Sequence, residues 1–306
     1  MKHEITPDTR AAVARIFSIA LFGIMSALPL HTQDFKFIQI DHPNAEATSA
    51  LGINDQGTIV GAFVESNTSH GFLLRGGKFK TIDPPGAIFT AARSINARNE
   101  IVGFYSDANG NEHGFYFYNG RYATIDIPNS IDTRAEGIND MGVISGEYSD
   151  VNGNEHGFLF QGGKVKSIDV PDYLSTDIWA VANNRAFAGD DWDGSTVHGF
   201  VSPKPNVFVQ LDYPRAVVTA ARGINDKTEV VGRWDDNSVP LNGACSTQCH
   251  GFFWARGEFR SVDAPGAAST VTLGINNLGL IVGRFIDATG HEHGFMAVKC
   301  TDSGCQ

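Results

Sequence analysis

The residues of this chain best suited to chemistry follow six threonines that recur along the sequence. The threonines are Thr48, Thr90, Thr133, Thr176, Thr219 and Thr270. Charged and aromatic side chains stand one or three places after the middle four: Arg93, Arg134, Glu136, Asp177, Trp179 and Arg222. Residues two apart on a strand face the same side, so we expect these side chains to converge. Ionisable groups gathered in a partly apolar pocket are the usual starting hypothesis for a site.

The chemistry that these residues favour is metal-assisted attack on a carbonyl. Glu136, Asp177 and the turn residue Asn139 would supply oxygen ligands of the kind that Ca²⁺ takes. The ion would polarise a lactone or ester carbonyl, and one of the two carboxylates or a metal-bound water would deliver the attack. Arg93 or Arg222 would stabilise the developing oxyanion. The alternative is a channel filled by salt bridges that satisfy one another.

Substrate binding is predicted for Trp179, Arg134 and Trp192. Two of these belong to the fourth copy of a repeat, the copy that departs most from the others. There Ala182 replaces an asparagine found in the other five copies, and Trp192 stands among three aspartates. Aromatic rings beside carboxylates suit a sugar or a cation, whereas neutral drift of one repeat would leave the same pattern.

Three signatures recur six times and define a repeat of about 43 residues. His-Gly-Phe begins at His70, His113, His156, His198, His250 and His293. Asp-x-Pro begins at Asp41, Asp83, Asp126, Asp169, Asp212 and Asp263. A glycine always lies 13 residues after the threonine, whereas the spacing from that glycine to the histidine varies from 9 to 18. Variation confined to one segment indicates an exposed loop on a packed framework.

Each repeat has the pattern of four short strands. In the third copy these are expected at 134–138, 143–148, 156–160 and 164–168, joined by turns rich in Asn, Asp and Gly. Four strands and three hairpins make one propeller blade. Residues 35–40 form a fourth strand with no first three, and the last copy ends after three. The sequence therefore predicts an all-β, six-bladed propeller whose N-terminal strand completes the last blade, with an open solenoid as the alternative.

A family resemblance rests on two segments of the first copy, 52–61 (GINDQGTIVG) and 70–74 (HGFLL). Repeated in phase six times, they resemble the HAF-type extracellular repeat family, with Gly where that family's name has Ala. The resemblance implies export and a repeat fold. It brings no catalytic residues.

Residues that occur in every copy are expected to be framework. We predict that each histidine ties its strand to a neighbouring backbone group, and that each Asp of Asp-x-Pro caps a turn. The loops at 107–112, 150–155 and 287–292 carry oxygen-bearing residues at alternate positions, as calcium loops do. Their Asn-Gly and Thr-Gly pairs equally suit a hairpin turn, which we favour.

The N-terminal 33 residues are expected to be a signal peptide with no clear cleavage site. Basic residues precede an apolar run at 16–30 that is short for a bilayer span, although an uncleaved anchor is the alternative. The predicted domains are this leader, a propeller over 34–299 and a tail over 300–306, in a secreted or periplasmic protein. The expected disulfides are Cys245–Cys249 and Cys300–Cys305, and a zinc site is the rival interpretation.

The net charge of −11, with no basic cluster, argues against nucleic acid as a partner. Two functions stay open. One is a secreted, possibly calcium-dependent hydrolase of lactones or esters with its site in the channel, which rests on analogy with other six-bladed propellers. The other is a non-catalytic propeller that binds a glycan, a small ligand or a protein. An enzyme of the first kind needs convergent carboxylates with open coordination, whereas a binding protein needs no such carboxylates, only an exposed face of aromatic and polar side chains. No stable membrane insertion of the mature protein is expected.

Overall fold

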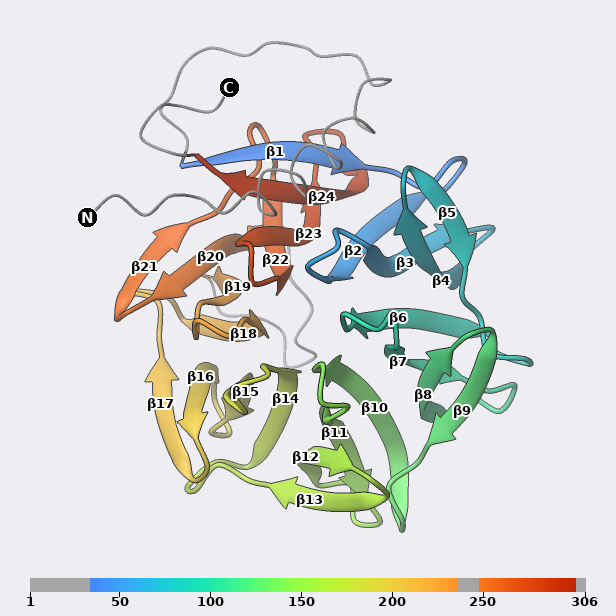
Figure 1. The fold of residues 1–306 in the computed structure, drawn as a ribbon. Coiled ribbons are helices and arrows are strands. Elements are labelled where there is room, and N and C mark those ends of the chain that lie inside the picture. Colours follow the sequence, from blue (N-terminus) through green and yellow to red (C-terminus); the bar gives the residue numbers. More distant parts are fainter. Residues whose placement is uncertain (1–33, 236–247, 301–306) are drawn as a thin grey trace.

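The computed structural model describes residues 34–235 and 248–300, and its strands form six blades around a central channel (Figure 1). The innermost strands are β2 (Ala47–Ile53), β6 (Phe89–Ile95), β10 (Ser130–Ile138), β14 (Ser175–Val181), β18 (Val218–Ile224) and β22 (Ser269–Ile275). The second strands are β3 (Ile59–Glu65), β7 (Ile101–Ser106), β11 (Ile144–Asp150), β15 (Phe187–Trp192), β19 (Val230–Asp235) and β23 (Leu280–Ile286). The third strands are β4 (Thr68–Arg75), β8 (Glu112–Tyr118), β12 (Glu155–Gln161), β16 (Val197–Lys204), β20 (His250–Ala255) and β24 (Glu292–Lys299). The outer strands are β5 (Lys78–Thr81), β9 (Arg121–Ile125), β13 (Lys164–Ile168), β17 (Val207–Leu211), β21 (Glu258–Ser261) and β1 (Phe35–Ile40).

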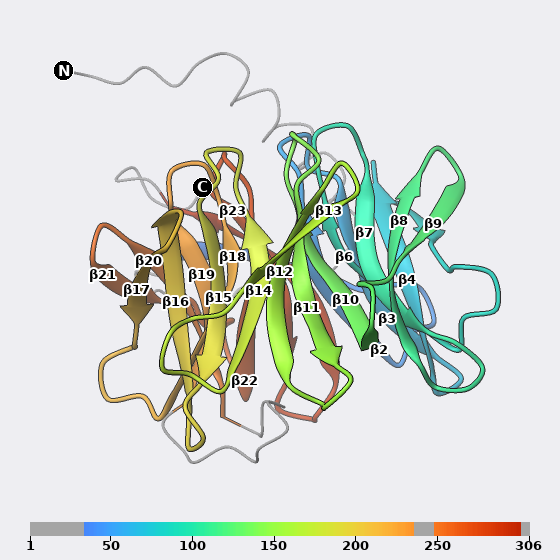
Figure 2. The same cartoon turned by 90° about the horizontal axis from the view of Figure 1, so that it is seen from below.

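The ring closes as the sequence predicts. Strand β1 pairs antiparallel with β24, from Phe35 opposite Lys299 to Ile40 opposite Gly294, so the first segment completes the sixth blade (Figure 1). This pairing covers the backbone edge that β24 would otherwise expose. Within each blade the strands pair antiparallel in sequence order, and from the side they run between the two faces of the ring (Figure 2).

The repeat position requires glycine because two neighbouring groups occupy the space that a side chain would fill. A Cβ on Gly103 would lie 2.0 Å from the carbonyl oxygen of Ala91 and 2.8 Å from the ring of Phe115. Phe115 is the phenylalanine of His-Gly-Phe, and its counterparts in all six blades are fully buried. The glycine therefore lets the inner strand pack directly over the largest core side chain of its blade.

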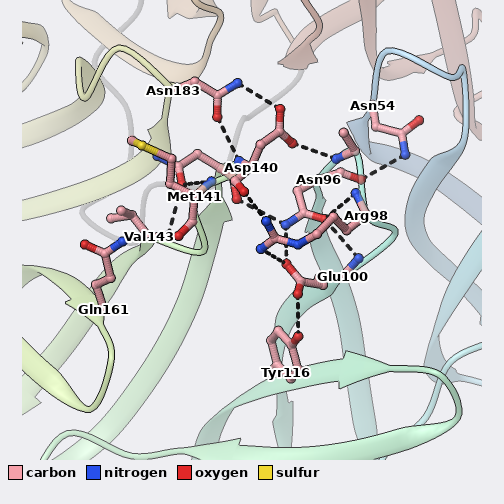
Figure 3. Close-up of polar contacts among 12 residues, drawn as sticks. Asn54, Asn96, Arg98, Glu100, Tyr116, Asp140, Met141, Val143, Gln161 and Asn183 are labelled. Carbon is pink, nitrogen blue, oxygen red and sulfur yellow. Dashed lines mark hydrogen bonds and ion pairs between the residues drawn. The ribbon is translucent and has the colours of Figure 1, made fainter.

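The turn asparagines link neighbouring blades, as Figure 3 shows for Asn54 and Asn96. In the last blade, the Oδ1 atom of Asn276 accepts hydrogen bonds from its own turn, and its Nδ2 donates to the carbonyl oxygen of Asn54 at 3.0 Å. The same donation runs from Asn54 to Asn96 and from Asn96 to Asn139. Where Ala182 breaks the pattern, the neighbouring Asn184 donates to the carbonyl oxygen of Asp226 at 2.9 Å.

The six histidines are framework, but their partner differs from the one expected. Each Nδ1 lies 2.7–3.1 Å from the carboxylate of an Asp-x-Pro motif, as in His70 with Asp83 and His293 with Asp41. The predicted tie to the backbone is therefore wrong, because the aspartate lies directly opposite on the adjacent outer strand or its end. The aspartate of the 107–112 loop closes a turn, since its Oδ1 accepts from the backbone N–H groups of Asn109 and Asn111.

The predicted leader (1–33), the tail after residue 300, Cys245 and Cys305 lie outside the described residues, so the leader and the disulfide pairing stay predictions. Among residues 34–235 and 248–300, no helix is long and apolar enough to cross a membrane.

Candidate ligand site in the central channel

The waist of the channel is formed by the third residue after each repeat threonine. These six residues are Leu51, Arg93, Glu136, Trp179, Arg222 and Leu273, and they line a cavity of about 110 Å³ at the face of the turn asparagines. In every inner strand the register skips this residue, so each one is the extra residue of a β-bulge. A bulge aims its side chain out of the ladder, which places all six side chains in the channel.

The polar side chains of the waist pair with one another and with Asp190, and Oε1 of Glu136 and Nη1 of Arg222 have no hydrogen-bond partner among the described residues. The ring of Trp179 lies between two guanidinium groups, with the Cζ of Arg222 at 3.6 Å and that of Arg93 at 4.7 Å from its centroid. Arg93 is ion-paired with Glu136, and Arg222 with Asp190 at 3.1 Å. The indole N–H of Trp179 also donates to Asp190 at 3.1 Å. Burial raises the pKa of Glu136 against the opposing charge of Arg93.

A larger chamber of about 310 Å³ adjoins the waist and is lined at its other end by the first residues of the inner strands. Its apolar lining residues are chiefly Leu51, Val64, Phe89, Ala91, Val271 and Leu273. Its charged lining residues are four arginines and one glutamate: Arg93, Arg222, Arg233, Arg284 and Glu292. The chamber therefore combines an apolar surface with an excess of guanidinium groups.

The chamber lies to one side of the axis because the repeat positions that flank it differ between blades. The first residue after the threonine pairs across the strands with the residue after the repeat glycine. The first of these positions is small or apolar in four blades: Ser49, Ala91, Ala220 and Val271. In blades three and four it is Arg134 and Asp177, and long polar side chains fill the corresponding space.

Arg134 and Asp177 belong to this packed polar cluster and line neither cavity. Arg134 pairs with Glu112 and, at 2.9 Å, with Glu147. Asp177 lies beside Glu147, and Oδ1 of Asp177 and Oε2 of Glu147 have no hydrogen-bond partner among the described residues. Burial and the negative charge of Glu147 and Asp190 raise the pKa of Asp177 well above its usual value.

Of the residues singled out from the sequence, the structure brings Arg93, Glu136, Trp179 and Arg222 together in one cavity and places Arg134 and Asp177 outside both cavities. Trp192, at the end of β15, also lines neither cavity. Asn139 does line the smaller one, but its Oδ1 already accepts from the backbone N–H groups of Met141 and Val143. Among the described residues, no group of three or more His, Cys, Asp or Glu side chains could hold a metal ion.

Sequence reasoning missed Arg233, Arg284 and Glu292. The sequence position directly after the repeat glycine could have pointed to Arg233 and Arg284, because its residue type is shared by two successive blades and then changes. It reads Ala62, Phe104, Glu147, Asp190, Arg233 and Arg284 around the ring. Arg233 is 3% exposed, and burial together with the nearby charges of Arg222 and Arg284 lowers its pKa to about 10. Burial is the larger cause of this shift and the two neighbouring guanidinium groups add to it, while Asp190 and Asp235 oppose it.

Glu292 connects the chamber to the blade interface. One of its oxygens accepts a hydrogen bond from the Ser49 hydroxyl at 2.5 Å, and the other is ion-paired with Arg284. Ser49 lies on the first blade and Glu292 on the sixth, at the single parallel bridge that joins these sheets.

Comparison with solved structures shows a β-propeller. The chain is similar to a putative TolB from Agrobacterium tumefaciens (TM-score 0.58, 8% identity, 82% of this chain and 90% of that one). It is also similar to a mutant Aleuria aurantia lectin in complex with Fucα1-6GlcNAc (0.51, 9%, 82% and 93%). A third is a triple mutant of AofleA from Arthrobotrys oligospora (0.51, 12%, 86% and 87%). At these identities the likeness shows the fold alone. No protein-family model and no curated protein matches the chain, so the HAF-type resemblance rests on the repeat motifs themselves.

Proposed function

We propose that this protein binds a small organic anion, one with an apolar portion, in the larger chamber of its channel. The observation that carries the proposal is the composition of the chamber wall. Four arginines and one glutamate line it together with Leu, Val, Phe and Ala side chains. Guanidinium groups recognise carboxylates and phosphates with two parallel hydrogen bonds, and apolar walls hold the rest of such a ligand.

The volume and the charge both favour a small anion. A cavity of about 310 Å³ lies at the lower end of the range for small-molecule sites. Arg233 is nearly buried, and burial, followed by the charge of Arg222, lowers its pKa. A bound anion would offset both effects, because it adds negative charge beside Arg222, Arg233 and Arg284.

A binding role fits the waist better than the calcium-assisted hydrolysis expected from the sequence. Hydrolysis of that kind needs carboxylates that converge on one ion, yet Glu136 lines the waist and is paired with Arg93, whereas Asp177 is buried beside Glu147 and lines neither cavity. The carboxamide oxygen of Asn139 is occupied by its own turn. Calcium and a catalytic role for these residues therefore stay predictions without support from the geometry, and export stays a proposal that rests on the leader sequence.

Titration calorimetry with three ligands of matched size tests the binding proposal. We expect benzoate to bind, and benzyl alcohol and benzylamine to bind at least tenfold more weakly. Arg284→Gln should weaken benzoate binding by about 10- to 100-fold, which is the usual effect on affinity of losing one hydrogen bond between charged groups. Arg121→Gln, on an exposed outer strand, is the matched control and should leave binding unchanged. Equal affinity for all three ligands, or an Arg284→Gln variant that binds as the parent does, would refute the proposal.

A further inference from the structure

We infer that the chamber also hydrolyses esters of such anions, with Ser49 as nucleophile and Glu292 as its general base. This inference rests on the proposed anion site, which would hold the acid portion of the substrate. The Ser49 hydroxyl donates to Oε1 of Glu292 at 2.5 Å, and both residues line the larger chamber. A hydroxyl within hydrogen-bond reach of a base, with that base oriented by a third group, is the arrangement of an activated nucleophile.

Arg284 is the third group. It is ion-paired with the Glu292 oxygen that Ser49 does not use, so the carboxylate is held with its remaining oxygen toward the hydroxyl. The Glu292 side chain is 22% exposed and that of Arg284 is 31% exposed, which leaves the pair accessible from the chamber. Arg222 and Arg233, on the same chamber wall, supply positive charge for an oxyanion that forms inside the cavity.

The reaction balances with water as the second substrate. The Ser49 oxygen attacks the ester carbonyl carbon while its proton passes to Glu292. The tetrahedral adduct collapses, the C–O bond to the alcohol breaks, and the alcohol leaves with the proton from Glu292. Water then attacks the acyl-serine ester and gives its proton to Glu292. The Ser49 oxygen leaves as the hydroxyl with that proton, and the free acid remains.

The hydroxyl of Ser49 has no counterpart in the framework. The same repeat position is Ala91 in the second blade and Ala220 in the fifth, so the blade folds with a methyl group there. Ser261, on the outer strand β21, donates to the carboxylate of Asp263 at 2.5 Å and lines neither cavity. It offers a matched comparison, because it has a carboxylate partner at the same distance but lies outside the chamber.

The test is hydrolysis of mono-4-nitrophenyl succinate, an anionic aryl ester, compared with neutral 4-nitrophenyl butyrate. We expect the anionic ester to be the better substrate. Ser49→Ala should lower kcat/KM at least 100-fold and Glu292→Gln at least tenfold, whereas Ser261→Ala should keep the parent rate. A fluorophosphonate probe should label Ser49, located by peptide mass spectrometry, in the parent and in Ser261→Ala.

Benzoate binding separates the two proposals. Because Ser49→Ala leaves the arginines in place, it should bind benzoate with the parent affinity. If the parent binds benzoate but neither cleaves the anionic ester nor takes the probe at Ser49, the hydrolytic inference is overturned and the anion site stands. If Ser49→Ala hydrolyses as fast as the parent, Ser49 is not the nucleophile. If benzoate does not bind at all, the proposed function itself fails.

Discussion

Replacing Asn276 with alanine is expected to destabilise the propeller by about 3 kcal/mol. The side chain is 4% exposed and makes three hydrogen bonds. Its Oδ1 accepts from the N–H groups of Leu278 (3.1 Å) and Leu280 (3.0 Å), and its Nδ2 donates to the carbonyl oxygen of Asn54 (3.0 Å). Each such bond contributes about 1 kcal/mol net, and their loss leaves buried backbone groups without those partners. The bond to Asn54 crosses the junction between the last blade and the first, where the ring closes.

Equilibrium urea unfolding, followed by tryptophan fluorescence and circular dichroism, measures this loss. Asn109→Ala is the control, because Asn109 bonds only within an exposed turn of its own loop and should change the unfolding free energy by less than about 0.5 kcal/mol. The reasoning is refuted if the two variants differ by less than 1 kcal/mol. Hydrogen exchange adds a second readout, since Asn276→Ala should lower protection first in β1, β2 and β24, the strands at the junction.

Three further predictions concern protons and packing. Burial lowers the pKa of His293, but the two aspartates beside the ring outweigh that effect and raise the pKa above 6.5. The stabilising contribution of the charged His293 is therefore present below pH 6.5 and is lost as pH rises. In thermal melts, the stability cost of His293→Gln should shrink between pH 5.5 and 8.5. The pKa of Asp177 is raised in the fold, so this group costs stability as pH climbs above its ordinary pKa of about 4. Asp177→Asn should therefore match or exceed the parent's urea midpoint at pH 7, whereas Glu147→Gln should lower it, and a clear loss in Asp177→Asn would contradict the raised pKa. Gly103→Ala would place a methyl group 2.0 Å from the Ala91 carbonyl oxygen and should abolish soluble folded protein, while folding at the parent level would show that the strands can separate at small cost.

The repeat made the architecture predictable. Six in-phase copies with one variable segment gave the blades, the hairpins and the closure by residues 35–40, because each blade must bury the same phenylalanine beneath the same glycine. The waist was also predictable, since strand alternation puts the third residue after each threonine on the channel side. Alternation alone does not include the bulge that gives this position its outward aim, which emerges only from the paired register.

The chamber was decided by the tertiary structure. Arg233 and Arg284 reach the channel from second strands, because the first-strand residues opposite them, Ala220 and Val271, are too small to fill the space. Asp177 was expected in the channel on the same periodicity, but Glu147 from the neighbouring blade holds it in a buried pair. The sequence alone thus determined the repeating framework, where each residue's environment is set within its own copy. Contacts between strands and between blades decide which polar groups meet. Ser49 and Glu292, for example, are 243 residues apart in the chain.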